Sequence, residues 1–269
     1  MARQRGDIER AIGLCVEGAA WDELLITLEH AVEVGVVGGL RPQLLARWRS
    51  TIPQANAAAP ISRLLDGLVE RERDPTTTEA NDALDDAATG FRAAANPALE
   101  LVALSHLGYV ARISGEPDRV LAARDRIAAL AEHHAPAAAF LPLCDAWLAL
   151  VRGRPDDQLA AIEAIDDSLL PELWRATRDH LVAHALSNLG RPHEALAAVP
   201  KNIETRHLAI PGALSTELGC HWWAGHPEVI HDWPADGIGA EYGARDRFVT
   251  NVFLALCRGY AGDVHSARR

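Results

Sequence analysis

Apolar positions in the last two thirds of the chain recur at helical spacing, in stretches that end at short glycine-containing turns. A second helical stretch follows a turn, as in Arg119–His133 after the first turn and Asp156–Ile165 after the second. The pattern therefore predicts a series of paired helices. The first helices of the five pairs are expected over Leu99–Ile113, Ala137–Val151, Leu173–Leu189, Ala213–Ala224 and Phe248–Ala261.

The glycines of these turns are evenly spaced, at 38, 37, 35 and 37 residues. Four of the five turns also have a proline two residues after the glycine. Glycine can take the left-handed conformation that closes a helix, and proline suits the first turn of the next one. Each turn is therefore predicted to be an elbow between two antiparallel helices. The five elbow glycines are Gly115, Gly153, Gly190, Gly225 and Gly262.

The first third of the chain also predicts helices, over Leu44–Thr51, Pro60–Arg73 and Thr78–Ala95, but without the glycine period. Because a two-helix unit cannot bury its apolar face alone, such units must stack. We expect an all-α fold, a right-handed α-solenoid of antiparallel helix pairs. It is predicted to be one helical-repeat domain over 1–269, with irregular N-terminal helices at 1–97 and degenerate repeats of about 37 residues at 98–269.

The final predicted unit is incomplete, because only seven residues follow Gly262. A solenoid that stops within a unit leaves apolar helix surface uncovered. We therefore expect this chain to be a piece of a longer protein, and we expect self-association through its C-terminal end.

Composition removes several classes of function. Acidic residues outnumber basic ones, 37 to 26, which disfavours direct nucleic-acid contact. Lys201 is the only lysine and lies between proline and asparagine, so the chain has no Gly-Lys-Ser/Thr phosphate loop. The four cysteines form no Cys-x-x-Cys pair, and no apolar run is long enough for export or a membrane span. These observations predict a cytoplasmic protein without a cofactor.

Short motifs give a family resemblance. Leu107–Tyr109 (Leu-Gly-Tyr) and Asn188–Leu196 resemble tetratricopeptide repeats. Within Ala11–Pro53, a Trp-Asp-Glu-Leu-Leu helix start at Trp21–Leu25 precedes Leu-Leu-Ala-Arg-Trp at Leu44–Trp48. This order resembles the opening of the helical-repeat region in the large LuxR-type bacterial transcription activators, the family of the maltose regulator. The phosphate loop of that family is absent, and no basic DNA-reading helix is indicated. The resemblance therefore implies a sensor region that binds an inducer or a protein.

Candidate binding residues come from the first helix of each unit, which lines the concave wall of a solenoid. Aromatic rings together with an arginine and two histidines suit an organic ligand or a peptide segment. The tryptophans also fit the simpler role of filling gaps between units. Counting back from each elbow by the helical period, the exposed stripe is predicted to contain Ser105, Tyr109, Arg112, Trp147, Thr177, His180, His184 and Trp222.

Two histidine groups raise the alternative of a metal-dependent enzyme. His180 and His184 are one helical turn apart, a spacing that can hold a metal. A second group, at the fourth elbow, comprises Cys220, His221, His226 and His231. Neither contains a His-Glu-x-x-His motif, and no Gly-x-Ser-x-Gly or Gly-x-Gly-x-x-Gly motif is present. We therefore predict neither a metal nor catalysis. A further alternative is a tetratricopeptide-like adaptor unrelated to transcription.

Overall fold

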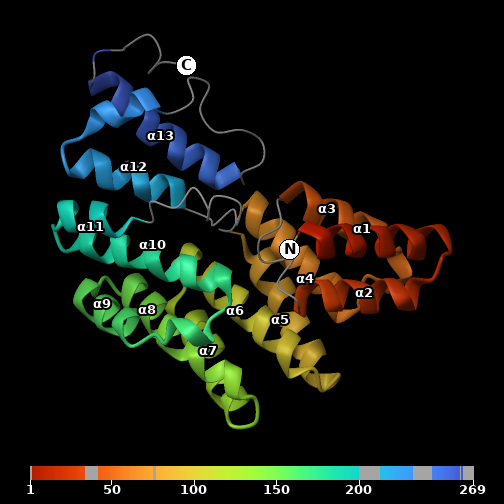
Figure 1. Ribbon diagram of the computed structural model, residues 1–269. Helices are drawn as coiled ribbons and strands as arrows, with labels where there is room; N and C mark the ends of the chain where they lie inside the picture. The colour runs from red at the N-terminus through yellow and green to blue at the C-terminus, as the bar shows by residue number, and fades with distance from the viewer. Residues whose placement is uncertain are drawn as a thin grey trace. The chain divides into compact units, whose positions relative to one another are not determined.

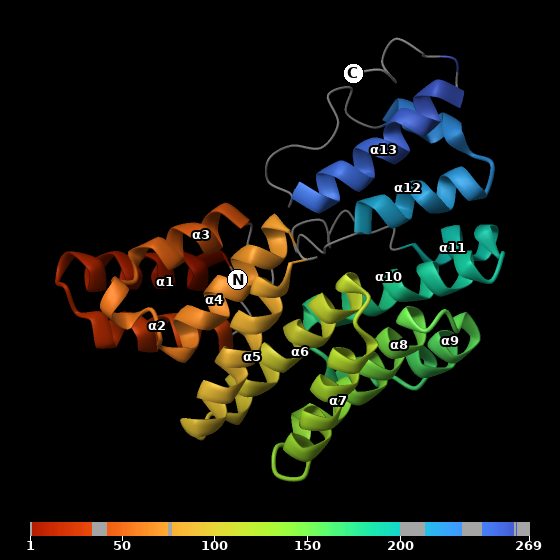
Figure 2. The same ribbon diagram turned by 180° about the vertical axis from the view of Figure 1, so that it is seen from behind.

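The computed structural model describes residues 2–33, 42–74, 77–199, 213–232, 244–260 and 262. The described secondary structure consists of thirteen α-helices and short 3₁₀ turns, and no strand occurs among these residues (Figures 1 and 2). The predicted all-α fold class is therefore confirmed. None of the described helices combines the length and apolarity needed to cross a membrane. The chain divides into two compact units, Met1–Cys144 and Asp145–Arg269.

In the first unit, most helices that are neighbours in sequence pack against each other, and α2 also packs against α4 and α6. The pairs are α1 with α2, α3 with α4, α4 with α5, α5 with α6, and α6 with α7. Figure 1 shows this succession from red to green. The helices are α1 (Ala2–Glu17), α2 (Trp21–Glu33), α3 (Pro42–Thr51), α4 (Pro60–Arg73), α5 (Thr78–Ala93), α6 (Pro97–Ser114) and α7 (Pro117–Ala131).

Two glycines inside helices bring α4 and α5 close together. A Cβ atom added to Gly67 on α4 would lie 2.6 Å from Cγ of Leu84 on α5. A Cβ atom added to Gly90 on α5 would lie 2.6 Å from Cγ of Pro60, at the start of α4. Glycine is therefore required at both positions for space, and the large side chains around this contact, including Leu84 and Phe91, are almost completely buried.

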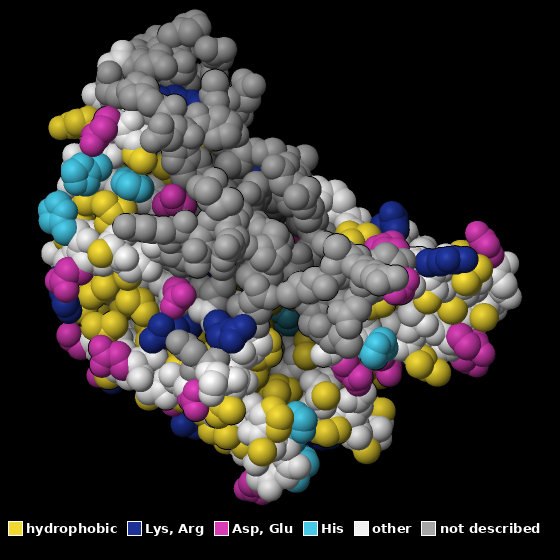
Figure 3. All heavy atoms as spheres, viewed as in Figure 1, with side chains coloured by type: hydrophobic (Ala, Val, Ile, Leu, Met, Phe, Trp, Pro, Cys, Tyr) yellow, Lys and Arg dark blue, Asp and Glu magenta, His cyan; other side chains and the backbone are white. Residues whose placement is uncertain are grey.

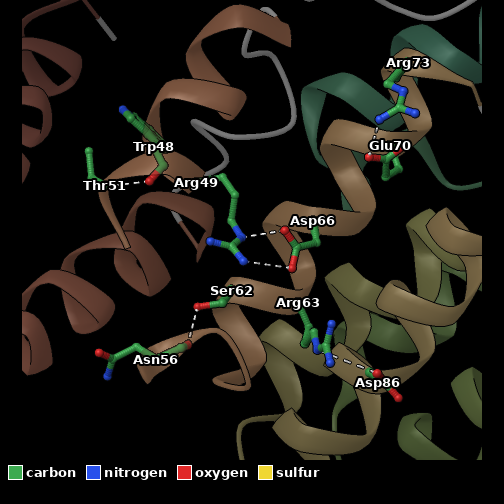
Figure 4. A network of polar contacts seen from close by, with 10 residues as sticks. All are labelled: Trp48, Arg49, Thr51, Asn56, Ser62, Arg63, Asp66, Glu70, Arg73 and Asp86. Atoms are coloured by element: carbon green, nitrogen blue, oxygen red, sulfur yellow. Dashed lines mark hydrogen bonds and ion pairs between the residues drawn. The ribbon is translucent and has the colours of Figure 1, made fainter. Parts of the chain in front are cut away.

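Hydrogen bonds and ion pairs between polar side chains connect α3 to α4 and α4 to α5 (Figure 4). Arg49 on α3 donates hydrogen bonds to both carboxylate oxygens of Asp66 on α4, with 3.3 Å between Nη2 and Oδ2. Ser62 donates a hydrogen bond of 2.9 Å to the carbonyl of Asn56, which anchors the 3₁₀ turn before α4. The two-point Arg49–Asp66 contact fixes geometry better than a single ion pair would.

The glycine elbows have the predicted backbone geometry. The φ angles are 72° at Gly115, 67° at Gly153, 71° at Gly190, 80° at Gly225 and 87° at Gly262. In the first four elbows, the N–H of the residue after the glycine donates to the carbonyl five residues earlier, at 2.9 Å each time. This bond satisfies a carbonyl that the helix end would leave unpaired. The predicted left-handed conformation is therefore confirmed at all five glycines. A helix follows the turn at Gly115, Gly153 and Gly190, a 3₁₀ turn follows Gly225, and the residues after Gly262 lie outside the described part of the chain.

Two further elbows use alanine instead of glycine. Ala19, between α1 and α2, has φ 48°, and Ala95, between α5 and α6, has φ 54°. Each is followed by the same backbone bond, of 2.8 Å from Ala20 to Cys15 and 2.9 Å from Asn96 to Phe91. The expected helix over Thr78–Ala95 is therefore too long, because α5 ends at Ala93 and the chain turns at Ala95.

In the second unit, α9 packs on α10, α10 on α11, α12 on both α10 and α11, and α13 on α12. Buried Ala183, Leu186, Ala195 and Cys220 form one core cluster of this unit. The predicted helix over Ala137–Val151 consists of a 3₁₀ turn, Ala135–Phe140, followed by α8. The helices are α8 (Leu141–Val151, which begins in the first unit), α9 (Pro155–Glu163), α10 (Glu172–Asn188), α11 (Pro192–Ala198), α12 (Ala213–Trp223) and α13 (Ala244–Tyr260).

The single-domain prediction for 1–269 stays a prediction, because adjacent stretches of one continuous array also form compact units. Helix pairs are observed within each unit, whereas the solenoid and its handedness belong to the proposal below.

Candidate functional site

The most unusual side-chain arrangement in the first unit surrounds the ring of Tyr109 on α6. The guanidinium carbon of Arg112 lies 4.7 Å from the centre of this ring, and that of Arg71 lies 6.0 Å from it. Tyr109 is only 3% exposed and Arg71 only 7% exposed. A cation over an aromatic face contributes about 2 kcal/mol or more when water is excluded. The arrangement therefore holds two cations against one desolvated aromatic ring.

Arg71 connects this ring to a buried histidine. Its Nη1 lies 2.9 Å from Nδ1 of His106, and its Nη2 donates to Oε1 of the adjacent Glu72. Because a guanidinium has only donors, Nδ1 of His106 must accept, and the histidine is neutral in this contact. Burial, and next the charge of Arg71, hold the pKa of His106 well below its ordinary value of 6.5. Glu72 supplies the negative charge that Arg71 needs when it is buried.

Local sequence explains how these groups meet. Arg71 lies three residues after Leu68 and seven after Leu64, so it continues the buried stripe of α4. On α6, Tyr109 and Arg112 are three residues apart and share a face. We name Arg71, Glu72, His106, Tyr109 and Arg112 the arginine–tyrosine cluster. Sequence reasoning found Tyr109 and Arg112 but missed the other three, although the spacing of Arg71 was a usable signal.

The predicted stripe is less exposed than expected. Ser105, Tyr109, Trp147, Thr177 and His180 are buried, while Arg112, His184 and Trp222 are half-buried. The expectation of an exposed stripe is therefore wrong for five of these eight residues. Their role in binding stays a prediction.

The predicted residues of α10 make contacts that support the fold. Thr177 donates to the carbonyl of Leu173 at 2.8 Å. His180 Nε2 lies 3.3 Å from the hydroxyl of Thr216 and so connects α10 to α12. His184 Nδ1 lies 3.0 Å from the side-chain amide of Asn188. The two histidines are thus engaged with different polar groups.

The tryptophans pack against other rings. Trp147 is fully buried and lies edge-on to Trp174, with 5.6 Å between ring centroids. Trp222 lies edge-on to Tyr260 of α13, also at 5.6 Å. These contacts favour the simpler interpretation, in which both predicted tryptophans fill space between helices.

Histidines gather around the end of α12 and beside α11 (Figure 3). The rings of His193 and His226 lie edge to face at 6.1 Å, and His226 Nδ1 lies 3.2 Å from Oε1 of Glu228. Burial, and then the neighbouring His226, lower the pKa of His221. The described part of the chain contains no group of three or more His, Cys, Asp or Glu placed to hold a metal ion.

Cys220, one residue of the fourth-elbow histidine–cysteine group, is poorly suited to bind a metal. Cys220 is buried within 3.4 Å of the hydroxyl of Ser187, and burial raises the pKa of its thiol. The thiol is therefore the favoured form, whereas a metal would require the thiolate. The side chain of His231 lies outside the described residues.

Known proteins provide no further guide to the site. No protein-family model matches the chain, and no curated protein or solved structure matches it either.

Proposed function

We propose that this chain is a non-catalytic binding protein, a right-handed α-solenoid that acts as the ligand-sensing or protein-docking region of a bacterial LuxR-type transcription regulator. Two observations support the architecture: helix pairs pack in sequence order, and one elbow geometry recurs from Gly115 to Gly225. The regulatory part is supported by the sequence resemblance. In a solenoid, helices contact mainly their neighbours, so an occupied site can change curvature and transmit occupancy to attached modules.

The arginine–tyrosine cluster carries the proposal. Arg112 is half-buried while Tyr109 and Arg71 are buried, so Arg112 is the more exposed of the two arginines of the cluster, although its Nε is buried. Stacking on Tyr109 fixes the plane of this guanidinium, and a planar guanidinium binds a carboxylate through two parallel hydrogen bonds. The site is therefore suited to a carboxylate, in a small organic acid or in an acidic peptide.

Binding is tested by the thermal unfolding midpoint of the whole chain, titrated with succinate, citrate and an acidic decapeptide at constant ionic strength. At least one probe should raise the midpoint saturably, because a ligand that binds only the folded state stabilises it. Arg112→Gln should raise the probe concentration that gives half of the maximal midpoint shift at least tenfold. Arg124→Gln is the matched control, since Arg124 is also a partly exposed arginine of this unit and pairs with the adjacent Asp125. The proposal fails if no probe saturates or if the two variants behave alike.

The regulatory role needs a separate test in the source bacterium. Transcript profiles are compared between strains carrying the natural gene, a deletion, Arg112→Gln and Arg124→Gln. We expect Arg112→Gln to reproduce the changes seen in the deletion strain, with Arg124→Gln resembling the natural gene. A deletion that alters no transcript would remove the regulatory role. Saturable peptide binding in that case would favour the adaptor alternative.

A further inference from the structure

Helix α13, the last described helix of the second unit, carries a second apolar face besides the one in its core. Its exposed side chains include Phe248 (71%), Val252 (43%), Leu256 (45%) and Tyr260 (74%). These four residues recur every fourth position, so they form one continuous stripe on α13. We name them the α13 stripe. A helix in a globular protein normally turns such a stripe toward a partner.

The opposite side of α13 is already used by the core. Leu254 and Cys257 are buried and form a cluster with Leu218 of α12. At 100° per residue, they lie roughly 120° to 180° around the helix from the centre of the stripe. Helix α13 is therefore apolar on two sides, and packing against α12 covers one of them, reaching the stripe only where Tyr260 lies edge-on to Trp222.

Charge is absent from the stripe. Among the described side chains of α13, the charged residues are Arg247 and Arg258. At 100° per residue, both lie roughly 140° to 160° from the centre of the stripe. The positions within the exposed face, Ala255 and Gly259, are small. A second helix could therefore approach closely without burying an unpaired charge.

The size of the patch fits a protein interface. Trp223 is 56% exposed and lies edge-on to Phe253, at 5.9 Å between ring centroids, beside the stripe. With ordinary side-chain areas, Trp223 and the α13 stripe expose about 600 Å², the upper end of what a monomer usually shows in one patch. Two copies in contact would bury about 1,200 Å², the lower end of the range for specific protein interfaces.

We infer that the occupant of the α13 stripe is a second copy of this chain, held across a twofold axis with the two α13 helices antiparallel. The stripe reads aromatic, aliphatic, aliphatic, aromatic in both directions. An antiparallel pair centred between Val252 and Leu256 places Val252 of one copy against Leu256 of the other. The same axis places Phe248 against Tyr260, so the patch is complementary to itself, as a twofold contact requires. This inference is independent of the proposed function.

The test measures the mass of the whole chain by light scattering during size-exclusion chromatography, across a range of protein concentrations. The natural chain should approach twice its mass of 29.0 kDa as the concentration rises. The double variant Val252→Glu with Leu256→Glu should raise the dimer dissociation constant about a hundredfold, because it brings four carboxylates together at the axis. Asn251→Glu is the control, since it adds a carboxylate, one per chain against two in the double variant, at an exposed position of α13 outside the stripe. It should leave the dissociation constant within about threefold.

Circular dichroism establishes that each variant is folded. If the double variant does not fold, Phe248→Ser replaces it, and a tenfold weaker dimer is then expected. The inference is overturned if the natural chain stays monomeric at every concentration. It is overturned equally if a folded stripe variant dimerises as tightly as the natural chain, or if Asn251→Glu weakens the dimer as much as the stripe variants do.

Discussion

Residues 1–97 and residues 98–269 build the same elbow from different amino acids. In the first region, Ala19 and Ala95 hold the left-handed conformation, and glycine lies inside helices, at Gly67 and Gly90. In the second region, glycine holds that conformation at the elbows, although glycine also lies inside helices there, as at Gly219. The backbone bond that closes the helix is the same in both regions, 2.8–2.9 Å long.

The difference separates two uses of glycine. A Cβ atom at Gly115 would meet nothing within 4 Å, so glycine is favoured there by its φ angle alone. At Gly67 the φ angle is helical, and glycine is required because Leu84 leaves no room. A repeat period is therefore visible in sequence only where the φ requirement is met by glycine. Where alanine holds the positive φ angle instead, the elbow residue itself gives no signal in the sequence.

The largest expected effect tests the use of glycine for space. Gly67→Ala should lower the free energy of unfolding by about 2 kcal/mol, since the new methyl group overpacks against Leu84. The matched control is Gly13→Ala on α1, where an added Cβ meets nothing within 4 Å. That variant should be more stable, by up to about 1 kcal/mol, because alanine favours helix. Urea denaturation measures both, and equal effects would contradict the distinction.

The second prediction compares a buried histidine of the first unit with a half-buried one of the second. The pKa of His106 is lowered in the folded state, so below about pH 6.5 the unfolded chain takes up a proton that the folded chain does not. Stability contributed by neutral His106 is therefore complete above this pH and is lost as the pH falls. The slope for one proton is at most about 1.4 kcal/mol per pH unit.

His106→Gln should remove this slope between pH 7 and pH 5, since glutamine can still accept from Arg71 and does not titrate. His221→Gln should flatten the profile less, because His221 is only half-buried. Chemical denaturation at a series of pH values gives both slopes. An unchanged slope in His106→Gln would show that His106 is not the titrating group.

Much of the helical structure could be predicted from sequence, because capping signals are local. The helix expected over Pro60–Arg73 is found with those bounds, since proline begins it and an Asp-Pro pair follows it. The end of α5 was predicted two residues too late because an alanine at position 95 does not indicate a positive φ angle. The usable signal came one residue later, where Asn96 caps α6 by accepting from the N–H of Leu99, and proline follows at 97.

The candidate site was only half predictable. The spacing of Tyr109 and Arg112 places them together, since three residues make nearly one helical turn. The pairing of Arg71 with His106 joins positions 35 apart and depends on how α4 packs against α6, which spacing alone does not determine. Exposure was wrongly assigned on α6 because this helix is buried on nearly every side, so no polar face indicates its orientation.

The third prediction tests the use of glycine for backbone conformation. Gly115→Ala should lower the free energy of unfolding by about 1 kcal/mol, through torsional strain at φ 72° with no steric clash. Gly153→Ala should do the same, since its φ angle is 67° and its surroundings are equally open. A large difference between the two, measured by urea denaturation, would mean that something besides the φ angle acts at one elbow.

The smallest expected effect is the reverse substitution in the first region. Ala95→Gly relieves the strain of alanine at φ 54°, but glycine also gains entropy in the unfolded chain, which offsets part of the benefit. The net effect should be an increase in the free energy of unfolding of about 0.5 kcal/mol. Ala94→Gly is the matched control, because Ala94 has φ −81° and alanine is unstrained there. That control should destabilise the protein, so opposite signs at adjacent alanines would identify the left-handed conformation as the cause, and equal signs would show that Ala95 carries no strain.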